Sequence, residues 1–360
     1  LNTARYMTGV SGGTWAITLW IAWQKSIAEQ IERLSTHLET IPSKKTLIKN
    51  SIPEASSLNQ VKTLFGHRTG LTDIYSLCLS RALLAPFEEN FRQLKWSDIH
   101  QSLHPAQHPF PICTAVSPSI QSFTKYDWIE FTPYEIRLAI NDACIPTWAF
   151  MRRFNNGVSI DAMPEPWLGY TMGIWGSAFS ISFADVITKA KPLYQTILPS
   201  IFVEKITNQN WGAQKRFAAR IPNFSYGMPS SILGTKRPLL KMIDAGHSNN
   251  IGITPLMHAG RDQDLLIIIN AGTKPRLDLQ WMYDMRKRLR QRYGDFEFDI
   301  DKAASSPITF WPAKMVGCPD IIHIALHPDK HFDADYNPRT DPSTKTLNFI
   351  YPREKVLKLT

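Results

Sequence analysis

Hydrophobic positions in this chain fall into short continuous runs and into stripes of helical period, separated by polar segments. Residues 265–269 (LLIII) and 321–326 (IIHIAL) are the clearest runs, and each has the length of a strand buried on both faces of a sheet. Residues 4–10 and 112–116 predict two further strands. Because helical segments alternate with these runs, the pattern predicts an α/β fold with a central mixed sheet.

The segments between the strands are of three kinds. Residues 14–31 carry tryptophan and leucine along one side and predict a helix, and the small, apolar residues 169–184 predict a second, tightly packed one. Residues 43–62 are polar and hold a proline, which favours a surface loop. The pattern weakens over residues 194–238, where we expect an insertion.

The composition is that of a globular protein with a large core. Of the 360 residues, 43% are hydrophobic and 20% charged, and no apolar run reaches the roughly 20 residues that span a bilayer. The protein is therefore expected to touch a membrane without crossing it. The four cysteines are Cys78, Cys113, Cys144 and Cys318. They lie far apart with no C-x-x-C pair, which indicates neither a zinc site nor a disulfide framework. This cysteine pattern favours a reducing compartment.

The chain is basic, with a net charge of +9 and a pI near 9.3. Such a charge attracts an anionic surface, either nucleic acid or acidic lipid head-groups. The densest basic run lies on a predicted helix with an apolar stripe, and it fits lipid docking, a solvated helix face or a nucleic-acid contact. No zinc, helix-turn-helix or single-strand-binding pattern accompanies it. Its basic residues are Arg286, Lys287, Arg288, Arg290 and Arg292.

Residues 9–13 (GVSGG) stand between a predicted strand and a predicted helix. This is the context of a nucleophile elbow, a tight turn that projects a serine at the positive end of a helix. Gly9, Gly12 and Gly13 allow the strained turn and a close approach of substrate, and Ser11 is the candidate nucleophile. A serine in an ordinary glycine-rich turn fits the same five residues.

A second candidate lies in residues 242–252 (MIDAGHSNNIG). An apolar segment ends at Asp244, which places a carboxylate at the tip of a buried element, where the loss of solvent raises its basicity. Such a group suits a base for a hydroxyl. An aspartate that caps a turn through its own hydrogen bonds is the alternative.

Six blocks in the same order resemble the catalytic domain of cytosolic phospholipase A2, which is related to phospholipase B and the patatins. They are GVSGGTW at 9–15, WIEFTPYEI at 128–136, MGIWGSAFS at 172–180, DAG at 244–246, CPDIIH at 318–323 and TLNFIYP at 346–352. The resemblance implies a Ser-Asp dyad: Ser11 attacks an ester of a phospholipid or lysophospholipid, Asp244 takes its proton, and water hydrolyses the acyl-serine. It also implies that Arg261 binds the lipid phosphate and that no metal or other cofactor takes part.

The same resemblance implies a single catalytic domain over residues 1–360 with an inserted cap at about 120–240. It implies a cytoplasmic protein that associates with anionic membrane surfaces. The family has a glycine-rich segment upstream of the serine that forms the oxyanion hole, and the ten residues before Ser11 do not hold it. Since loss of an oxyanion donor costs about 100- to 1000-fold in rate, we expect weak activity from these 360 residues alone.

Two other functions stay open at this point. A Ser-His-Asp hydrolase would use His247, His258 or His323 as its base, although His323 lies inside an apolar run and fits a core residue better. A catalytically impaired, lipid-binding relative or truncated copy would keep the fold without the activity.

Overall fold

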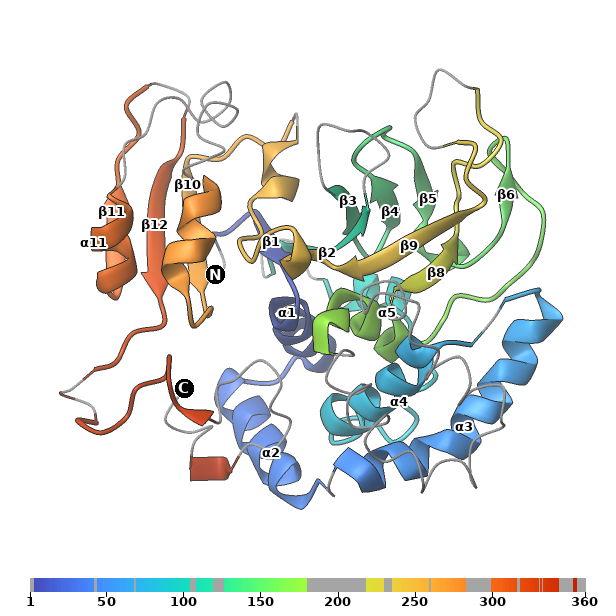
Figure 1. Cartoon of the computed structure of the whole chain (residues 1–360), viewed down its shortest axis with the longest axis horizontal. Coiled ribbons are helices and arrows are strands. Elements are labelled where there is room, and N and C mark those ends of the chain that lie inside the picture. Colours follow the sequence, from blue (N-terminus) through green and yellow to red (C-terminus); the bar gives the residue numbers. More distant parts are fainter. Residues whose placement is uncertain are drawn as a thin grey trace, which may run out of the picture. The chain divides into compact units, whose positions relative to one another are not determined.

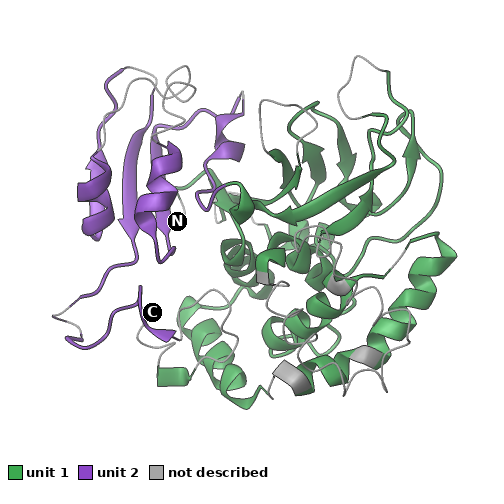
Figure 2. Ribbon diagram, in the orientation of Figure 1, with its two compact units in different colours: residues 1–248, 352–356 green, residues 249–351, 357–360 purple. Residues whose placement is uncertain are grey.

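The computed structural model describes residues 3–41, 44–67, 69–103, 108–118, 126–179, 218–229, 235–258, 260–282, 299–315, 318–329, 331, 333–342 and 352–354. The chain divides into two compact units, shown in Figure 2. Unit 1 comprises Leu1–Ser248 and Pro352–Val356, and unit 2 comprises Asn249–Tyr351 and Leu357–Thr360. That the whole chain acts as a single catalytic domain stays a prediction.

Unit 1 is built on a mixed sheet of seven strands. β5, β4, β3, β2, β9 and β8 lie side by side in that order and are antiparallel, while β1 pairs with β2 in parallel. The predicted α/β fold with a mixed central sheet is confirmed. The strands are β1 (Tyr6–Gly9), β2 (Phe110–Pro118), β3 (Tyr126–Phe131), β4 (Glu135–Leu138), β5 (Cys144–Pro146), β8 (Ala219–Pro222) and β9 (Leu239–Asp244), with a separate hairpin of β6 (Phe154–Asn155) and β7 (Val158–Ser159).

Helices of unit 1 gather on one side of this sheet, as Figure 1 shows for α1, α4 and α5. None of the helices in the described ranges is both long and apolar enough to span a bilayer. The α-helices are α1 (Gly12–Trp23), α2 (Ile27–Thr40), α3 (Lys44–Leu64), α4 (Leu71–Leu83) and α5 (Leu168–Trp175), and the short 3-10 helices are η1 (Ser97–Ser102), η2 (Thr147–Ala149), η3 (Ser177–Phe179) and η4 (Ala245–His247).

The core of unit 1 lies where β2 and α5 meet the other helices. Seven consecutive residues of β2 are buried, which agrees with the apolar run at residues 112–116. Every residue of α5 is buried as well. A side chain at Gly169 or Gly173 would collide with the hydroxyls of Ser80 and Ser76 on α4, so the small residues allow two helix backbones to approach closely. The tightly packed helix predicted here is confirmed, but it ends at Trp175.

Two predictions for the N-terminal half are wrong. The helix expected over residues 14–31 is two helices, because Gln24 adopts the left-handed conformation (φ 46°) at the end of α1 and the Ser26 hydroxyl caps α2. The polar segment 43–62 is not a loop but most of α3, a helix with Pro53 inside it. A few buried positions, such as Ile48, hold α3 against the rest of the unit. Tertiary packing of those positions outweighs the polar composition.

Residues 126–179, 218–229 and 235–240 of the predicted cap at about 120–240 are described. β3, β4, β5 and β8 fall within this range and belong to the main sheet. Residues 180–217, the middle of the range, lie outside the described residues. The inserted cap therefore stays a prediction.

Unit 2 contains a three-stranded sheet in the order β10–β12–β11, with β10 and β12 parallel and β11 antiparallel to β12. Its core gathers Leu266, Ile268, Trp311 and Ile321 on one face. The elements are η5 (Thr254–Met257), β10 (Leu265–Asn270), α11 (Ile300–Ser305), β11 (Ile308–Trp311) and β12 (Asp320–Ala325).

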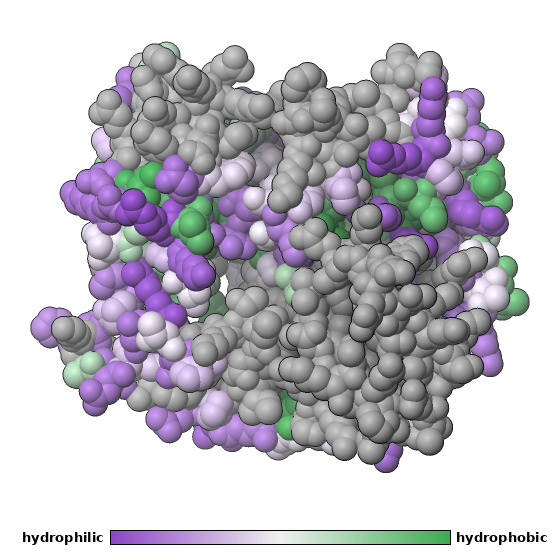
Figure 3. Space-filling model, viewed as in Figure 1, coloured by the Kyte–Doolittle hydropathy of each residue, from purple (hydrophilic) through white to green (hydrophobic). Residues whose placement is uncertain are grey.

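The strand at residues 265–269 was expected to be buried on both faces, and this is wrong. Its residues alternate between exposed and buried: Leu265, Ile267 and Ile269 are 45%, 58% and 76% exposed. Hydrophobic surface is visible on the part of Figure 3 that belongs to unit 2. The run is a strand as predicted, but a continuous apolar sequence does not by itself establish that both faces are covered.

Candidate active site

The strand pairing of unit 1 brings two distant segments together. β1 runs along β2 until Gly9 lies opposite Cys113, and Cys113 pairs with Phe131 of β3 on its other side. β9 approaches β2 from the opposite direction and ends at Asp244, which lies opposite Ala115. The two strand ends thus meet two residues apart along one edge of β2. Residues just beyond Gly9 and at the end of β9 are therefore neighbours.

The turn after β1 has the geometry of a nucleophile elbow. Ser11 has φ 53° and ψ −125°, a conformation that non-glycine residues rarely adopt and that costs about 1–3 kcal/mol. A Cβ on Gly9 would lie 2.9 Å from the backbone nitrogen of Thr14, so the turn requires a glycine there. The Ser11 side chain does not cap α1, although it stands at the N-cap position. Its hydroxyl is thereby available for another partner.

That partner is the carboxylate of Asp244. The Ser11 hydroxyl donates to Oδ2 of Asp244 over 2.7 Å. Asp244 is fully buried, and burial raises its pKa from an ordinary 3.8 to about 6, against the hydrogen bonds that favour the charged form. Near neutral pH the group is a carboxylate with raised basicity, within direct reach of a serine proton. This arrangement can deprotonate a hydroxyl without a histidine between the two.

Backbone amides complete the surroundings of this carboxylate. Gly246 N–H donates to Oδ1 over 2.7 Å, and Ala178 N–H donates to Oδ2 over 3.3 Å. The Asp244 amide in turn donates to the hydroxyl of Ser177 over 2.9 Å. In the sequence, residues 172–180 stand out only by their resemblance to a family, and neither Ser177 nor Ala178 was predicted to contact Asp244. A serine after a glycine, at the end of an otherwise apolar helix, is the signal that could have pointed to them.

The remaining predicted residues fall in unit 2, in η4 or outside the described residues. Arg261 belongs to unit 2, where its guanidinium donates to the carbonyl of Pro255 over 2.7 Å, and its role as a phosphate ligand stays a prediction. His258 and His323 also belong to unit 2, while His247 is the last residue of η4, three residues after Asp244. The basic run at 286–292 lies outside the described residues.

His323 is a core residue, as its sequence context suggested. It is fully buried, its ring stacks on Trp311, and burial lowers its pKa to about 4. With a pKa of about 4 the imidazole is uncharged at neutral pH, and its Nε2 lies 3.4 Å from Nδ2 of Asn270.

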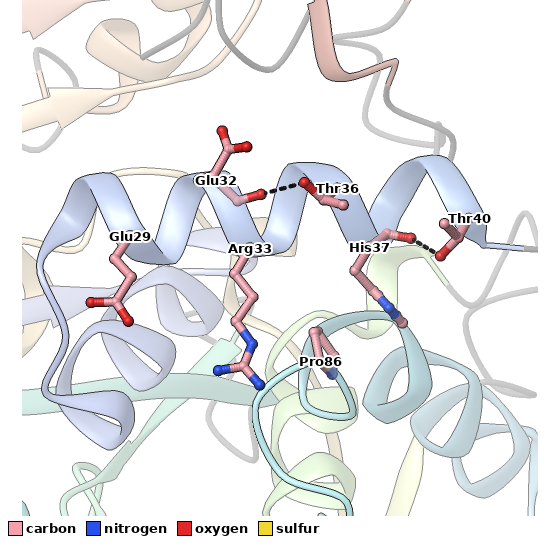
Figure 4. A pocket seen from close by; sticks show the side chains of 7 residues that line it. All are labelled: Glu29, Glu32, Arg33, Thr36, His37, Thr40 and Pro86. Atoms are coloured by element: carbon pink, nitrogen blue, oxygen red, sulfur yellow. Dashed lines mark hydrogen bonds between the residues drawn. The ribbon is translucent and has the colours of Figure 1, made fainter.

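Other features of the described ranges give no second site. They contain no group of histidine, cysteine and acidic residues that could hold a metal ion, and all four cysteines are free thiols. Figure 4 shows a pocket along α2 in which Arg33 and His37 lie on either side of Pro86, with Glu29 further along the same helix. The hydroxyls of Thr36 and Thr40 there donate to carbonyls of their own helix. This is the polar face of an amphipathic helix and includes neither Ser11 nor Asp244.

Serine hydrolases place a strained serine at a helix N-terminus on an α/β sheet. Ser11 has this setting, and its hydroxyl is hydrogen-bonded to a buried carboxylate. Residues 1–283 match the family model of the lysophospholipase catalytic domain, and the chain belongs to this family. Human cytosolic phospholipase A2 zeta is 33% identical over 196 residues, which are 52% of this chain and 22% of that protein. Mouse cytosolic phospholipase A2 epsilon is 27% identical over 197 residues, or 51% of this chain and 21% of that protein.

The fold agrees with the same relationship. The structure of human GIVD cytosolic phospholipase A2 matches with a TM-score of 0.77 at 19% identity, over 98% of this chain and 55% of that one. The same human protein, solved with methyl γ-linolenyl fluorophosphonate, matches with a TM-score of 0.70 at 17% identity, over 98% of this chain and 51% of that one. The match to this chain thus spans about a fifth of the curated relatives and about half of the solved structure.

Proposed function

We propose that this protein is a serine phospholipase or lysophospholipase that hydrolyses acyl esters of glycerophospholipids through a Ser11–Asp244 dyad. One observation carries the proposal: the hydroxyl of a strained serine donates directly to a fully buried carboxylate over 2.7 Å. Membership in the lysophospholipase family supports the choice of a lipid ester as substrate.

In the proposed reaction, Ser11 Oγ forms a bond to the ester carbonyl carbon while its proton moves to Oδ2 of Asp244. When the tetrahedral intermediate collapses, the ester C–O bond breaks and the departing alcohol takes that proton. Water then attacks the acyl-serine with Asp244 again as the base, which releases a fatty acid and restores the serine. The raised pKa of Asp244, about 6, suits a group that accepts and returns a proton near neutral pH.

The helix after the serine offers a donor for the oxyanion. The amide of Gly13 donates to the carbonyl of Val10, and the amide of Thr14 donates to that of Ser11. Gly12 is the first residue of α1, where backbone amides have no acceptor within the helix. We assign the Gly12 amide to the developing oxyanion, and Arg261, whose planar guanidinium suits phosphate, to the head-group.

Labelling by a long-chain fluorophosphonate tests the dyad. We expect covalent labelling of the wild-type chain at Ser11, and its loss in Ser11→Ala. Ser76→Ala is a matched control, because this buried hydroxyl of α4 donates to the carbonyl of Thr72 in its own helix, and its loss should leave labelling unchanged. His247→Asn should also label normally; loss of labelling in that variant would favour a Ser-His-Asp mechanism instead.

Association with an anionic membrane surface is the second part of the proposal. Its support is the net charge of +9 and the basic run at residues 286–292. Binding to acidic phospholipid vesicles should weaken as salt rises, and DNA should not compete for the protein. A protein that binds such vesicles but leaves Ser11 unlabelled would be the catalytically impaired, lipid-binding relative, and the dyad proposal would be withdrawn.

A further inference from the structure

We infer that the turn at residues 176–178 is the element that positions the base, with Ser177 as a positioning residue for Asp244. This inference deepens the proposed function and rests on it. Two adjacent residues of the turn hold Asp244 from different sides. The Ser177 hydroxyl accepts the Asp244 N–H over 2.9 Å, and the Ala178 N–H donates to Oδ2, the same oxygen that accepts the Ser11 hydroxyl.

The end of β9 needs such support. β9 pairs with β2 only at Ala115↔Asp244 and Val116↔Ile243, so a short ladder holds the residue that carries the carboxylate. Ser177 is 3% exposed, and its hydroxyl gives the amide of the fully buried Asp244 an acceptor within the protein. The side chain of Ser177 thus fixes the main chain of Asp244, and the following amide is directed at its carboxylate.

The Ala178 amide also acts on the charge of the base. Among the described residues, burial and the hydrogen bonds from Ser11, Gly246 and Ala178, rather than a neighbouring charge, set the pKa of Asp244. An N–H directed at Oδ2 favours the ionised form and keeps the carboxylate available as a base at neutral pH. If the turn shifts, this donor is lost, and a fully buried carboxylate retains its proton to higher pH.

The turn at residues 176–178 is itself held by two helices, α4 and α1, and α1 begins directly after Ser11. The Tyr75 hydroxyl on α4 donates to the carbonyl of Gly176 over 3.1 Å. The indole N–H of Trp15, one turn after Ser11 on α1, donates to the carbonyl of Met172 over 2.9 Å. A side chain at Gly176 would overlap the ring of Trp15, so the turn packs directly against α1. Nucleophile and base are therefore held by one common support.

The test is the pH dependence of acylation by a long-chain fluorophosphonate in the 360-residue chain. For wild type, the rate should fall below a pH of about 6, where Asp244 becomes protonated. Ser177→Ala should move this acid limb upward by about one pH unit, which is about a tenfold lower rate at a given pH below it. Ser177→Thr, which keeps the hydroxyl, should restore the wild-type limb. Ser76→Ala, a loss of another buried hydroxyl that packs against α5, should not move it.

A limb at the same pH in wild type and Ser177→Ala, or an equal shift in Ser76→Ala, would overturn the positioning role. If Ser177→Ala does not fold, replacing the Ala178 amide by an ester removes the same donor while keeping every side chain, and the same upward shift is expected. Failure of the proposed function is a separate result: acylation would then persist in Ser11→Ala or be unaffected in Asp244→Asn.

Discussion

Each of the two units buries an ionisable side chain at a strand, but the two side chains have opposite surroundings. In unit 1, Asp244 ends β9 and accepts hydrogen bonds from a hydroxyl and two amides. In unit 2, His323 lies within β12, stacked on Trp311, and its Nδ1 has no partner among the described residues. Burial raises the pKa of Asp244 to about 6 and lowers that of His323 to about 4.

The difference shows what burial alone can and cannot provide. Both groups are driven toward their neutral forms by the loss of solvent. Only Asp244 also contacts the hydroxyl of a serine with a strained backbone, Ser11, and accepts backbone N–H bonds that stabilise its charge. A shifted pKa therefore marks a candidate for chemistry in unit 1 and a neutral core residue in unit 2.

The largest effect that separates the two groups concerns acylation. We expect Asp244→Asn to lower the rate of fluorophosphonate labelling and of phospholipid hydrolysis by about 100- to 10,000-fold, because an amide cannot take the serine proton. His323→Asn removes the buried histidine of unit 2 and should leave the labelling rate within about twofold of wild type. A comparable loss in His323→Asn would mean that the histidine, and not the carboxylate alone, serves the serine.

A smaller effect concerns stability in acid. The folded-state pKa of His323 is about 4, while an unfolded chain takes up the proton near pH 6.5. The contribution of this residue is thus fully present above pH 6.5 and is lost as the pH falls toward 4, by up to about 3 kcal/mol. Thermal unfolding of wild type and His323→Asn between pH 4 and 7 measures it, since Asp244 is common to both proteins. Parallel curves for the two proteins would contradict the prediction.

The smallest effect concerns the elbow. A Cβ at Gly9 would lie 2.9 Å from both the Thr14 nitrogen and Cδ1 of Ile17, so Gly9→Ala should destabilise the protein by about 1–3 kcal/mol. Gly13→Ala is the matched control, because nothing lies within 4 Å of a Cβ there and alanine suits a helix better than glycine by about 0.5–1 kcal/mol. The melting temperature should fall in the first variant and hold or rise in the second. An equal fall in both would indicate that the Gly9 contact is not what limits the turn.

Local sequence predicted much of unit 1 because its signals are short-range. The apolar run of β2, the small residues of α5 and the glycines around Ser11 each require a particular backbone or packing, and the structure has them. The break at Gln24 was missed although Ser26 and Glu29 have the spacing of a helix N-terminus. The helical state of residues 44–64 was missed because the segment is polar and contains Pro53. The exposed face of β10 was missed because an apolar residue does not record which neighbours cover it.

The sequence by itself determined the family of this chain, its α/β class, and the identities of Ser11 and Asp244 as candidates. Only the tertiary structure decided that these two side chains touch, because their contact depends on β1 and β9 ending beside each other along β2, 233 positions apart in the chain. It also decided that Ser177 and Ala178 form hydrogen bonds to Asp244. Hydrogen bonds between distant backbone segments leave no pattern of spacing or polarity in a sequence, whereas a strained turn needs its glycines close by.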